Sequence, residues 1–166
     1  MHRLTTEQRN NIVRAAKEWL GTPYHHHARV KGAGADCAMF PLAVYQECGV
    51  LPREYRPPQY SVQWHLPRSE ELYLNEIEKF VMESEGPPRP ADFIVFRFGR
   101  TYSHGAIVMD WPIVIHAYIP HGVLLSDALR DGDLLGREHK YFELRPLATM
   151  EMAGRSNPGS LLSITD

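Results

Sequence analysis

The chain has 166 residues, enough for one domain with a buried core and too few for two domains of ordinary size. A net charge of -2 and a hydrophobic content of 43% are those of a common globular protein, without the basic excess of a nucleic-acid-binding one. No apolar stretch approaches the roughly 18 residues that a membrane span needs. The N-terminal segment lacks the apolar run of a signal peptide, so we expect synthesis in the cytoplasm, with lysis or packaging into a particle as the route outward.

The first part of the chain predicts a helix and then a loop. Thr5 and Gln8 match a capping box, and Gly21 ends the helix that they begin. The apolar face of this helix comprises Ile12, Ala16, Trp19 and Leu20. Residues 21–35 are rich in glycine and predict a loop.

A second helix is expected over residues 36–48, with Asp36 as its N-cap and Gly49 at its end. Pro41 has no N–H and leaves an early carbonyl, that of Cys37, without its helical partner. Two arrangements follow from this. We favour a distorted first turn that includes Cys37, and the alternative is a regular helix that begins at Pro41 with Cys37 just before it.

The rest of the chain predicts one more helix and then strands. Residues 51–67 predict an irregular segment, and 69–83 predict an amphipathic helix with Tyr73 on its apolar face. Strands are expected at 92–98, 104–109, 113–118, 123–125 and 141–146. Helices followed by antiparallel strands indicate an α+β fold with segregated layers. We expect a single domain over 1–150 and a mobile tail at 151–166.

His104 and His116 lie on consecutive predicted strands. A hairpin centred on Asp110 would place them directly opposite each other, where Cβ atoms are about 4.5–5.5 Å apart and the two rings can hydrogen bond. A slip of one residue would turn one ring to the other face. A histidine in a strand is more often a surface or core residue than a catalytic one, so the pair is significant only in combination with a nucleophile.

The chain has two cysteines, Cys37 and Cys48. On one helix they would be roughly 16 Å apart, whereas a disulfide needs Cα atoms within about 7 Å, so we expect both to be free. Amides at a helix N-terminus and a nearby imidazolium would stabilise a Cys37 thiolate. Cys48 lies among apolar residues and is interpreted as a small core residue. Cys37, His104 and His116 are therefore the candidate nucleophile, base and orienting group.

Three consecutive histidines, His25, His26 and His27, also stand out. Adjacent residues point in different directions, so three in a row rarely bind one ion, and we expect neither a metal nor another cofactor. We expect one or two of them, His26 in particular, to line a cleft beside Cys37.

Four parts of the sequence resemble the NlpC-type cysteine peptidases of bacterial cell-wall peptides, distant relatives of papain. They are residues 19–24 (WLGTPY), 34–37 (GADC), 89–96 (RPADFIVF), and 103–108 (SHGAIV) with 114–117 (VIHA). They occur in the order typical of the family. The Tyr-His-His sequence at 24–26 and Val-Lys-Gly at 30–32 are most similar to the branch encoded among phage and prophage tail genes.

The resemblance implies a papain-like fold, with N-terminal helices packed on an antiparallel sheet of about five strands and the nucleophile at a helix N-terminus. It implies Cys37 as nucleophile, His104 as general base and His116 as the polar third member. It further implies hydrolysis of peptidoglycan stem peptides without a metal, commonly between D-glutamate and a diamino acid, and other phage-tail proteins as partners.

The resemblance also indicates which residues contact substrate. Tyr24 and Asp36 match positions of the family's substrate pocket, where the aspartate helps to hold a free amino group. The full set of expected substrate-binding residues is Tyr24, Asp36, His26, Met39 and Ser103.

The residues after Cys37 depart from the family's pattern of a small pair followed by an aliphatic residue. Ala38 offers no hydroxyl to a substrate amine, and Met39 fills space that a glycine would leave open. Two alternatives therefore accompany the peptidase hypothesis. One is a catalytically weak or inactive assembly protein of a phage tail, and the other is a related thiol-dependent acyl transferase.

Overall fold

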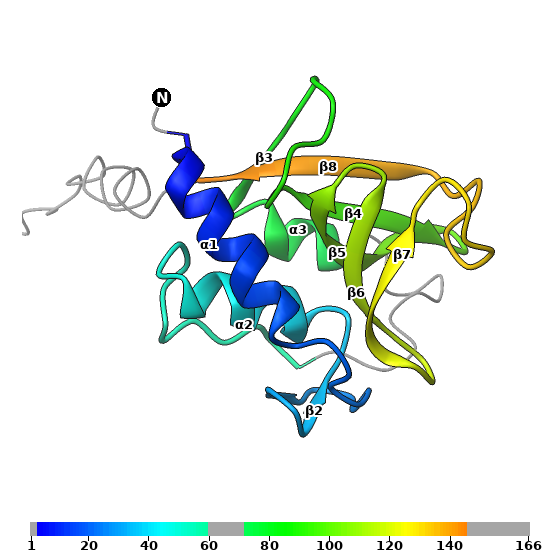
Figure 1. Ribbon diagram of the computed structural model, residues 1–166, viewed down its shortest axis with the longest axis horizontal. Helices are drawn as coiled ribbons and strands as arrows, with labels where there is room; N and C mark the ends of the chain where they lie inside the picture. The colour runs from blue at the N-terminus through cyan, green and yellow to red at the C-terminus, as the bar shows by residue number, and fades with distance from the viewer. Residues whose placement is uncertain (1–2, 60–71, 146–166) are drawn as a thin grey trace, which may run out of the picture.

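A six-stranded antiparallel sheet with helices beside it forms the body of the protein (Figure 1). The computed structural model describes residues 3–59 and 72–145. The helices are α1 (Thr6–Lys17), α2 (Met39–Glu47) and α3 (Leu72–Ile77). The strands of the sheet are β3 (Val81–Glu83), β4 (Phe93–Phe98), β5 (Thr101–Asp110), β6 (Ile113–Tyr118), β7 (Gly122–Asp127) and β8 (His139–Leu144). The architecture confirms the predicted α+β class, and in the described ranges no helix is both long and apolar enough to span a membrane.

The strand order in the sheet is β3-β8-β4-β5-β6-β7. The sheet has one strand more than the five predicted, and β5, β7 and β8 begin earlier in the chain than predicted. The predicted tail at 151–166 and the last residues of the predicted domain, 146–150, lie outside the described residues. The domain boundary therefore stays a prediction.

The N-terminal helix begins as its sequence predicts. The Gln8 amide donates to the Thr5 side chain at 3.2 Å, and the Thr5 amide donates to the Gln8 side chain at 2.9 Å, which completes the capping box. Trp19 is buried, but Leu20 is 43% exposed, so its predicted place on the buried face is wrong. The helix ends at Lys17, and Leu20 therefore falls where the helical periodicity no longer applies.

The first third of the chain has one short feature that differs from prediction. The expected loop at 21–35 contains an antiparallel ribbon of β1 (Arg29–Val30) and β2 (Gly34–Ala35), whose strands are too short to leave a periodic signal. The regular part of the second helix begins at Met39, and Cys37 lies in the turn before it. The Phe40 amide donates to the Asp36 carbonyl at 3.0 Å across this turn, in agreement with the favoured distorted first turn. Pro41 falls in the first turn of α2, where a missing N–H removes no intrahelical hydrogen bond.

The predicted helix at 69–83 is much shorter in the structure. Its start, 69–71, lies outside the described residues, α3 ends at Ile77, and residues 81–83 form the edge strand β3. Val81 pairs with Leu144 and is buried against the sheet. Pairing with β8 therefore overrides the helical pattern of the sequence, as tertiary contacts commonly do in short amphipathic segments.

The β5–β6 hairpin has a different register from the predicted one. Ile107 pairs with Ile115 and Val108 with Val114, and the register shifts between Val108 and Asp110. Continued along the strands, this register displaces His116 by two residues from the position opposite His104, so the predicted direct pairing is wrong. A shift of two residues leaves both histidines on one face, because side chains alternate with a period of two.

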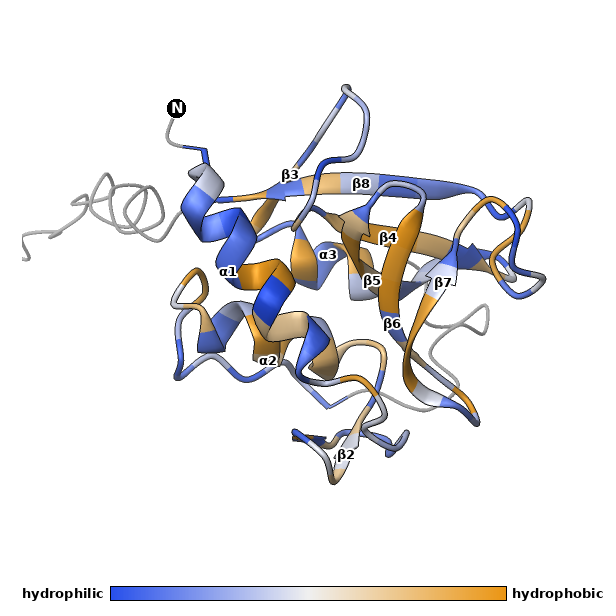
Figure 2. Ribbon diagram, viewed as in Figure 1, coloured by the Kyte–Doolittle hydropathy of each residue, from blue (hydrophilic) through white to orange (hydrophobic). Residues whose placement is uncertain are grey.

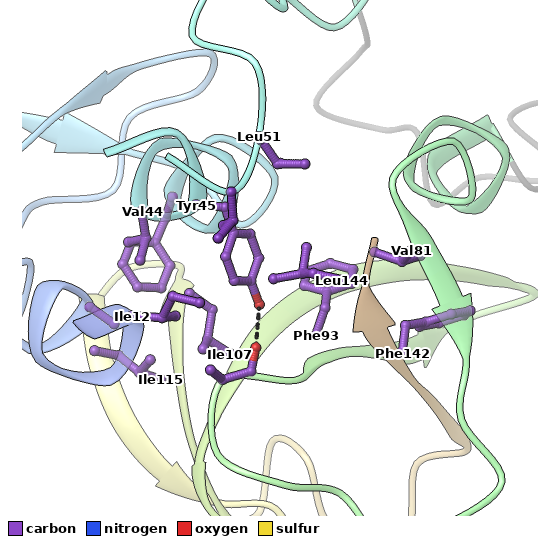
Figure 3. Close-up of a cluster of buried hydrophobic side chains, with 14 of the residues drawn as sticks. Ile12, Val44, Tyr45, Leu51, Val81, Phe93, Ile107, Ile115, Phe142 and Leu144 are labelled. Atoms are coloured by element: carbon purple, nitrogen blue, oxygen red, sulfur yellow. Dashed lines mark hydrogen bonds between the residues drawn. The ribbon is translucent and has the colours of Figure 1, made fainter. Parts of the chain in front are cut away.

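Buried side chains form a cluster on each face of the sheet. The larger one fills the space between the helices and the sheet, and Figure 3 shows side chains of α1, α2 and the strands meeting around Tyr45. The Tyr45 hydroxyl donates to the Ala91 carbonyl at 3.2 Å, the dashed line in that figure. The smaller cluster includes Ile94, Phe96 and Val108 on the opposite face. Burial on both sides explains why β6 is hydrophobic over most of its length, whereas much of β8 is hydrophilic (Figure 2).

Candidate active site

Asp36 organises the turn that carries Cys37. It is 1% exposed, and its Oδ1 accepts the amides of Ala38 at 3.0 Å and Met39 at 2.8 Å. Its Oδ2 accepts the His27 amide at 2.8 Å, and the His26 Nδ1 lies 3.7 Å away. The carboxylate therefore joins the histidine loop to the start of α2 and caps amides that the helix itself leaves unpaired.

Cys37 lies against the backbone of β5. Its Sγ donates to the Ser103 carbonyl at 3.9 Å, and the residue as a whole is 7% exposed. The Gly105 amide also interacts with Sγ, so the sulfur contacts the strand at the two residues that flank His104. Among the described residues, no hydrogen bond joins Sγ to the His104 ring.

The setting of Cys37 favours the neutral thiol. Burial, and then the negative charge of Asp36, raise its pKa to about 12. The amides of Gly105 and Cys37 and the hydroxyl of Tyr24 act in the opposite direction without cancelling these effects. The predicted stabilisation of the anion by backbone amides is present, but desolvation outweighs it.

His104 and His116 form the hydrogen bond that the sequence predicts, despite the shifted register. His104 Nε2 and His116 Nδ1 are 2.7 Å apart, and the rings meet edge to face. Only Nδ1 of His104 is therefore left for a reaction with Cys37. The His104 ring also packs against Phe98 and Tyr118, which fix its orientation.

A third strand extends this hydrogen-bond chain. His116 Nε2 and Ser126 Oγ are 2.8 Å apart, and Ser126 lies on β7. The chain of groups thus runs from β5 through β6 to β7. All three side chains are buried, with exposures of 7% for His104, 1% for His116 and 8% for Ser126.

Both rings are held in the neutral form. Burial lowers the pKa of His104 well below its usual value, and the neighbouring His116 and Arg137 add to the effect. Burial also lowers the pKa of His116 to about 4, although the carboxylates of Asp133 and Asp131 oppose it. A neutral imidazole is a base that can accept a proton, and the neutral Cys37 thiol and His104 ring are not a preformed ion pair.

The other expected substrate-binding residues lie around the same turn and strand. Tyr24 forms a bridge with Ala35, and its hydroxyl faces the Cys37 thiol. Met39 is buried at the start of α2. Ser103 is buried as well, and its hydroxyl donates to the Thr101 carbonyl at 3.5 Å. Within the described ranges, no group of three or more His, Cys, Asp or Glu side chains could hold a metal ion.

Comparison with known proteins gives the fold a precedent. No protein-family model matches the sequence, and no curated protein matches it. Solved structures do match. The NlpC/p60 domain of the peptidoglycan hydrolase SagA is 18% identical with a TM-score of 0.53, over 80% of this chain and 96% of that one. The chain has the NlpC/p60 fold.

Two further structures agree with this result. An NLP/P60-family protein similar to lipoprotein, from Staphylococcus aureus, is 19% identical with a TM-score of 0.57, over 84% of this chain and 42% of that one. NlpC2 from Trichomonas vaginalis is 14% identical with a TM-score of 0.58, over 86% of this chain and 48% of that one. The chain thus spans less than half of these two proteins, although it spans nearly all of the SagA domain.

Sequence reasoning missed two residues of the site in this NlpC/p60 fold. Ser126 lies outside the predicted strand at 123–125. The signal that could have found it is the strand pairing, because Leu124 is opposite His116 and Ser126 is two residues further along on the same face. Tyr73 was expected only as part of an apolar helix face. In the structure a Cβ added to Gly105 would overlap the Tyr73 hydroxyl and approach Phe93 Cζ to 2.7 Å. Gly105 thus lets Tyr73 pack against the strand beside Cys37.

An apolar cavity of about 390 Å³ lies next to this region. It is bounded by α2, residues 51–59, α3 and β8, and both Ala38 and Tyr73 line it. Cys37 and the two histidines are not among the described residues that line it. The cavity is therefore adjacent to the candidate site, but the described part of its lining does not include the proposed nucleophile or the histidine pair.

Proposed function

We propose that the protein is a cysteine peptidase that hydrolyses amide bonds in peptidoglycan stem peptides. The proposal assigns Cys37 as nucleophile, His104 as general base and His116 as the residue that orients His104. The observation that carries it is the histidine pair, whose 2.7 Å hydrogen bond leaves Nδ1 of His104 free on the strand that the Cys37 sulfur contacts. The likeness of the fold to the domain of a peptidoglycan hydrolase supports the same substrate class.

The chemistry follows from two neutral groups. The Cys37 thiol gives its proton to His104 Nδ1 as Sγ attacks the carbonyl carbon of the substrate, and the carbonyl becomes a tetrahedral oxyanion. The imidazolium then protonates the leaving amine, and the C–N bond breaks to leave a thioester. Water, deprotonated by His104, hydrolyses the thioester and restores the thiol. The Cys37 amide and the Tyr24 hydroxyl, which both interact with Sγ, are the donors for the oxyanion.

The finer substrate assignment rests on Asp36. In the proposal, the bond cut is that between D-glutamate and a diamino acid, and the free amine of the substrate approaches Asp36 Oδ2. His26, whose Nδ1 is 3.7 Å from that oxygen, is the group that the amine would displace. Tyr24, Met39 and Ser103 would contact the rest of the peptide. We further propose that the protein reaches the cell wall from the cytoplasm either as a component of a phage tail or by release at lysis.

Digestion of purified muropeptides tests the proposal. Wild-type protein should release new amino groups, identified by mass spectrometry of the products, and Cys37→Ala should abolish this release. Cys48→Ala is the matched control, because Cys48 is the other free cysteine and lies at the end of α2 away from Asp36. Equal turnover by wild type and Cys37→Ala would contradict the proposal.

A second candidate is an assembly protein of a phage tail with a catalytically silent site. The observation that favours it is the burial of Cys37, which is 7% exposed with a raised pKa. This candidate predicts no turnover of any muropeptide by the wild type. It also predicts that Cys37→Ala assembles into particles as well as the wild type does.

A further inference from the structure

We propose that Ser126 is a positioning residue that accepts a hydrogen bond from His116 and thereby selects the tautomer in which His104 can act as a base. The inference rests on the proposed function for its catalytic meaning. The tautomer itself is a property of the folded protein, whatever its substrate.

The strand register places Ser126 for this role. In the β6–β7 pair, His116 is opposite Leu124 and Val114 is opposite Ser126. Ser126 is thus the diagonal neighbour of His116 on the same face of the sheet. The 2.8 Å distance between Ser126 Oγ and His116 Nε2 is that of a good hydrogen bond, and the burial of both groups removes water as an alternative partner.

The direction of this hydrogen bond determines the state of the whole chain. If Ser126 accepts, the proton of His116 is on Nε2, and His116 Nδ1 must accept from His104 Nε2. The lone pair of His104 is then on Nδ1, where a thiol proton can be received. If Ser126 donates instead, His116 carries its proton on Nδ1, His104 carries its proton on Nδ1, and His104 cannot act as a base toward Cys37.

The charges around the chain favour the productive direction. The carboxylates of Asp131 and Asp133 act on His116, and Asp131 Oδ2 accepts the amide of Asp127, the residue after Ser126. The guanidinium of Arg137, whose Nε donates to the Asp133 carbonyl at 2.6 Å, acts on His104. Asp131 is the carboxylate tied to the residue after Ser126, and its negative charge stabilises an N–H dipole of His116 that points toward Ser126. This is the arrangement in which Ser126 accepts.

Among the described residues, Tyr118 is a further titratable group packed on the pair. Its ring contacts both His104 and His116, and its hydroxyl interacts with Asp133. Burial and Asp133 raise the pKa of Tyr118, so it stays a neutral phenol and does not disturb the field.

The first test is nitrogen-15 NMR of the histidine rings in the wild-type protein at neutral pH. Proton attachment at Nε2 of both His104 and His116 is expected. A proton on Nδ1 of either ring would overturn the inference. This measurement needs neither substrate nor a variant, so it decides the inference even if the muropeptide assay fails.

The second test uses variants of Ser126. Ser126→Ala should lower kcat roughly tenfold with little change in KM, because a buried Nε2–H without an acceptor favours the inactive tautomer. Ser126→Thr keeps the hydroxyl and should restore most of the rate. Leu125→Ala, on the same strand with a 45% exposed side chain, is the control for disturbance of β7.

The spectra of the variants separate positioning from a structural role. Ser126→Ala should show His116 protonated on Nδ1, while Ser126→Thr and Leu125→Ala should keep the wild-type pattern. An unchanged tautomer and unchanged kcat in Ser126→Ala would overturn the inference. If Ser126→Ala does not fold, the wild-type spectrum and the Ser126→Thr rate decide it.

Discussion

The cysteine end and the histidine end of the candidate site are built in different ways. Around Cys37, the contacts are mostly to backbone: Asp36 holds three amides, and Sγ rests on a carbonyl of β5. Around His104, they are side chain to side chain, through His116 to Ser126. The first arrangement depends on a local turn and the second on how three strands align.

The difference shows how each end can fail. The turn at Asp36 loses several hydrogen bonds when one side chain changes, whereas the histidine chain can lose its function through the misplacement of a single proton. Both ends share one property, because burial keeps the thiol and the imidazoles uncharged. The predictions below test these contrasts, from the largest expected effect to the smallest.

Alkylation of Cys37 should be slow at neutral pH. With a pKa of about 12 in place of about 9, the thiolate fraction is on the order of a thousandfold smaller than that of an unperturbed thiol. In a Cys48→Ala background, iodoacetamide labelling followed by mass spectrometry should therefore accelerate with pH and show no plateau below pH 10. Fast labelling with a plateau near neutral pH would reveal a resting thiolate–imidazolium pair. It would contradict the conclusion that burial keeps Cys37 and the imidazoles uncharged.

Asp36→Ala should destabilise the protein by about 4 kcal/mol. The change removes a buried carboxylate that accepts the amides of His27, Ala38 and Met39, and hydrogen bonds to a charged group contribute more than neutral ones. Urea unfolding measures the loss. Asp36→Asn, which keeps one acceptor oxygen, should lose clearly less, and equal losses would show that the backbone contacts are not what holds the turn.

Acid should destabilise the folded protein through His116, because folding lowers the pKa of this residue. The unfolded chain protonates His116 below its ordinary pKa of 6.5, while the folded protein does so only near 4. The stabilisation is therefore complete above pH 6.5 and is lost as the pH falls toward 4, by up to about 3 kcal/mol for this group. Urea unfolding from pH 7 to pH 4 measures it. His116→Asn should show a shallower decline, and parallel curves would contradict the role of His116.

Gly105→Ala should cost about 2 kcal/mol, because the new methyl group overlaps the Tyr73 hydroxyl and Phe93. Gly132→Ala is the matched control, since nothing lies within 4 Å of a Cβ there and its φ is not positive. Thermal unfolding compares the two. Equal midpoints would mean that α3 does not pack firmly against β5 at the site.

Local signals in the sequence were sufficient for the elements with strong periodicity. The capping box at Thr5, the helix over most of 36–48 and the order of the strands around His104 and His116 are all confirmed. Features that depend on pairing between distant segments were not accessible. The helical pattern at 81–83 gave no sign that Val81 would pair with Leu144, and the register of the β5–β6 hairpin depended on a bulge near Asp110.

For the candidate site, too, the residues with a chemical signature were predictable and the features set by long-range contacts were not. Cys37 and the histidine pair could be proposed because their residue types and spacing suggest chemistry. The neutral state of the thiol could not, since it depends on burial by residues far along the chain. Ser126 and Tyr73 carry no chemical signature of their own, and their importance comes only from what they contact.

The register of the β5–β6 hairpin also limits how the chain can change in length. Insertion or deletion of two residues in the turn near Trp111 would keep the imidazole of His116 on the side of the sheet where Ser126 lies. A single inserted residue would turn every later side chain of β6 to the opposite face of the sheet. An aliphatic side chain next to His116 in the sequence would then face Ser126 in place of the imidazole. Variation in this turn among proteins with the same three hydrogen-bonded groups is therefore expected to occur in even steps, unless a bulge absorbs the odd residue.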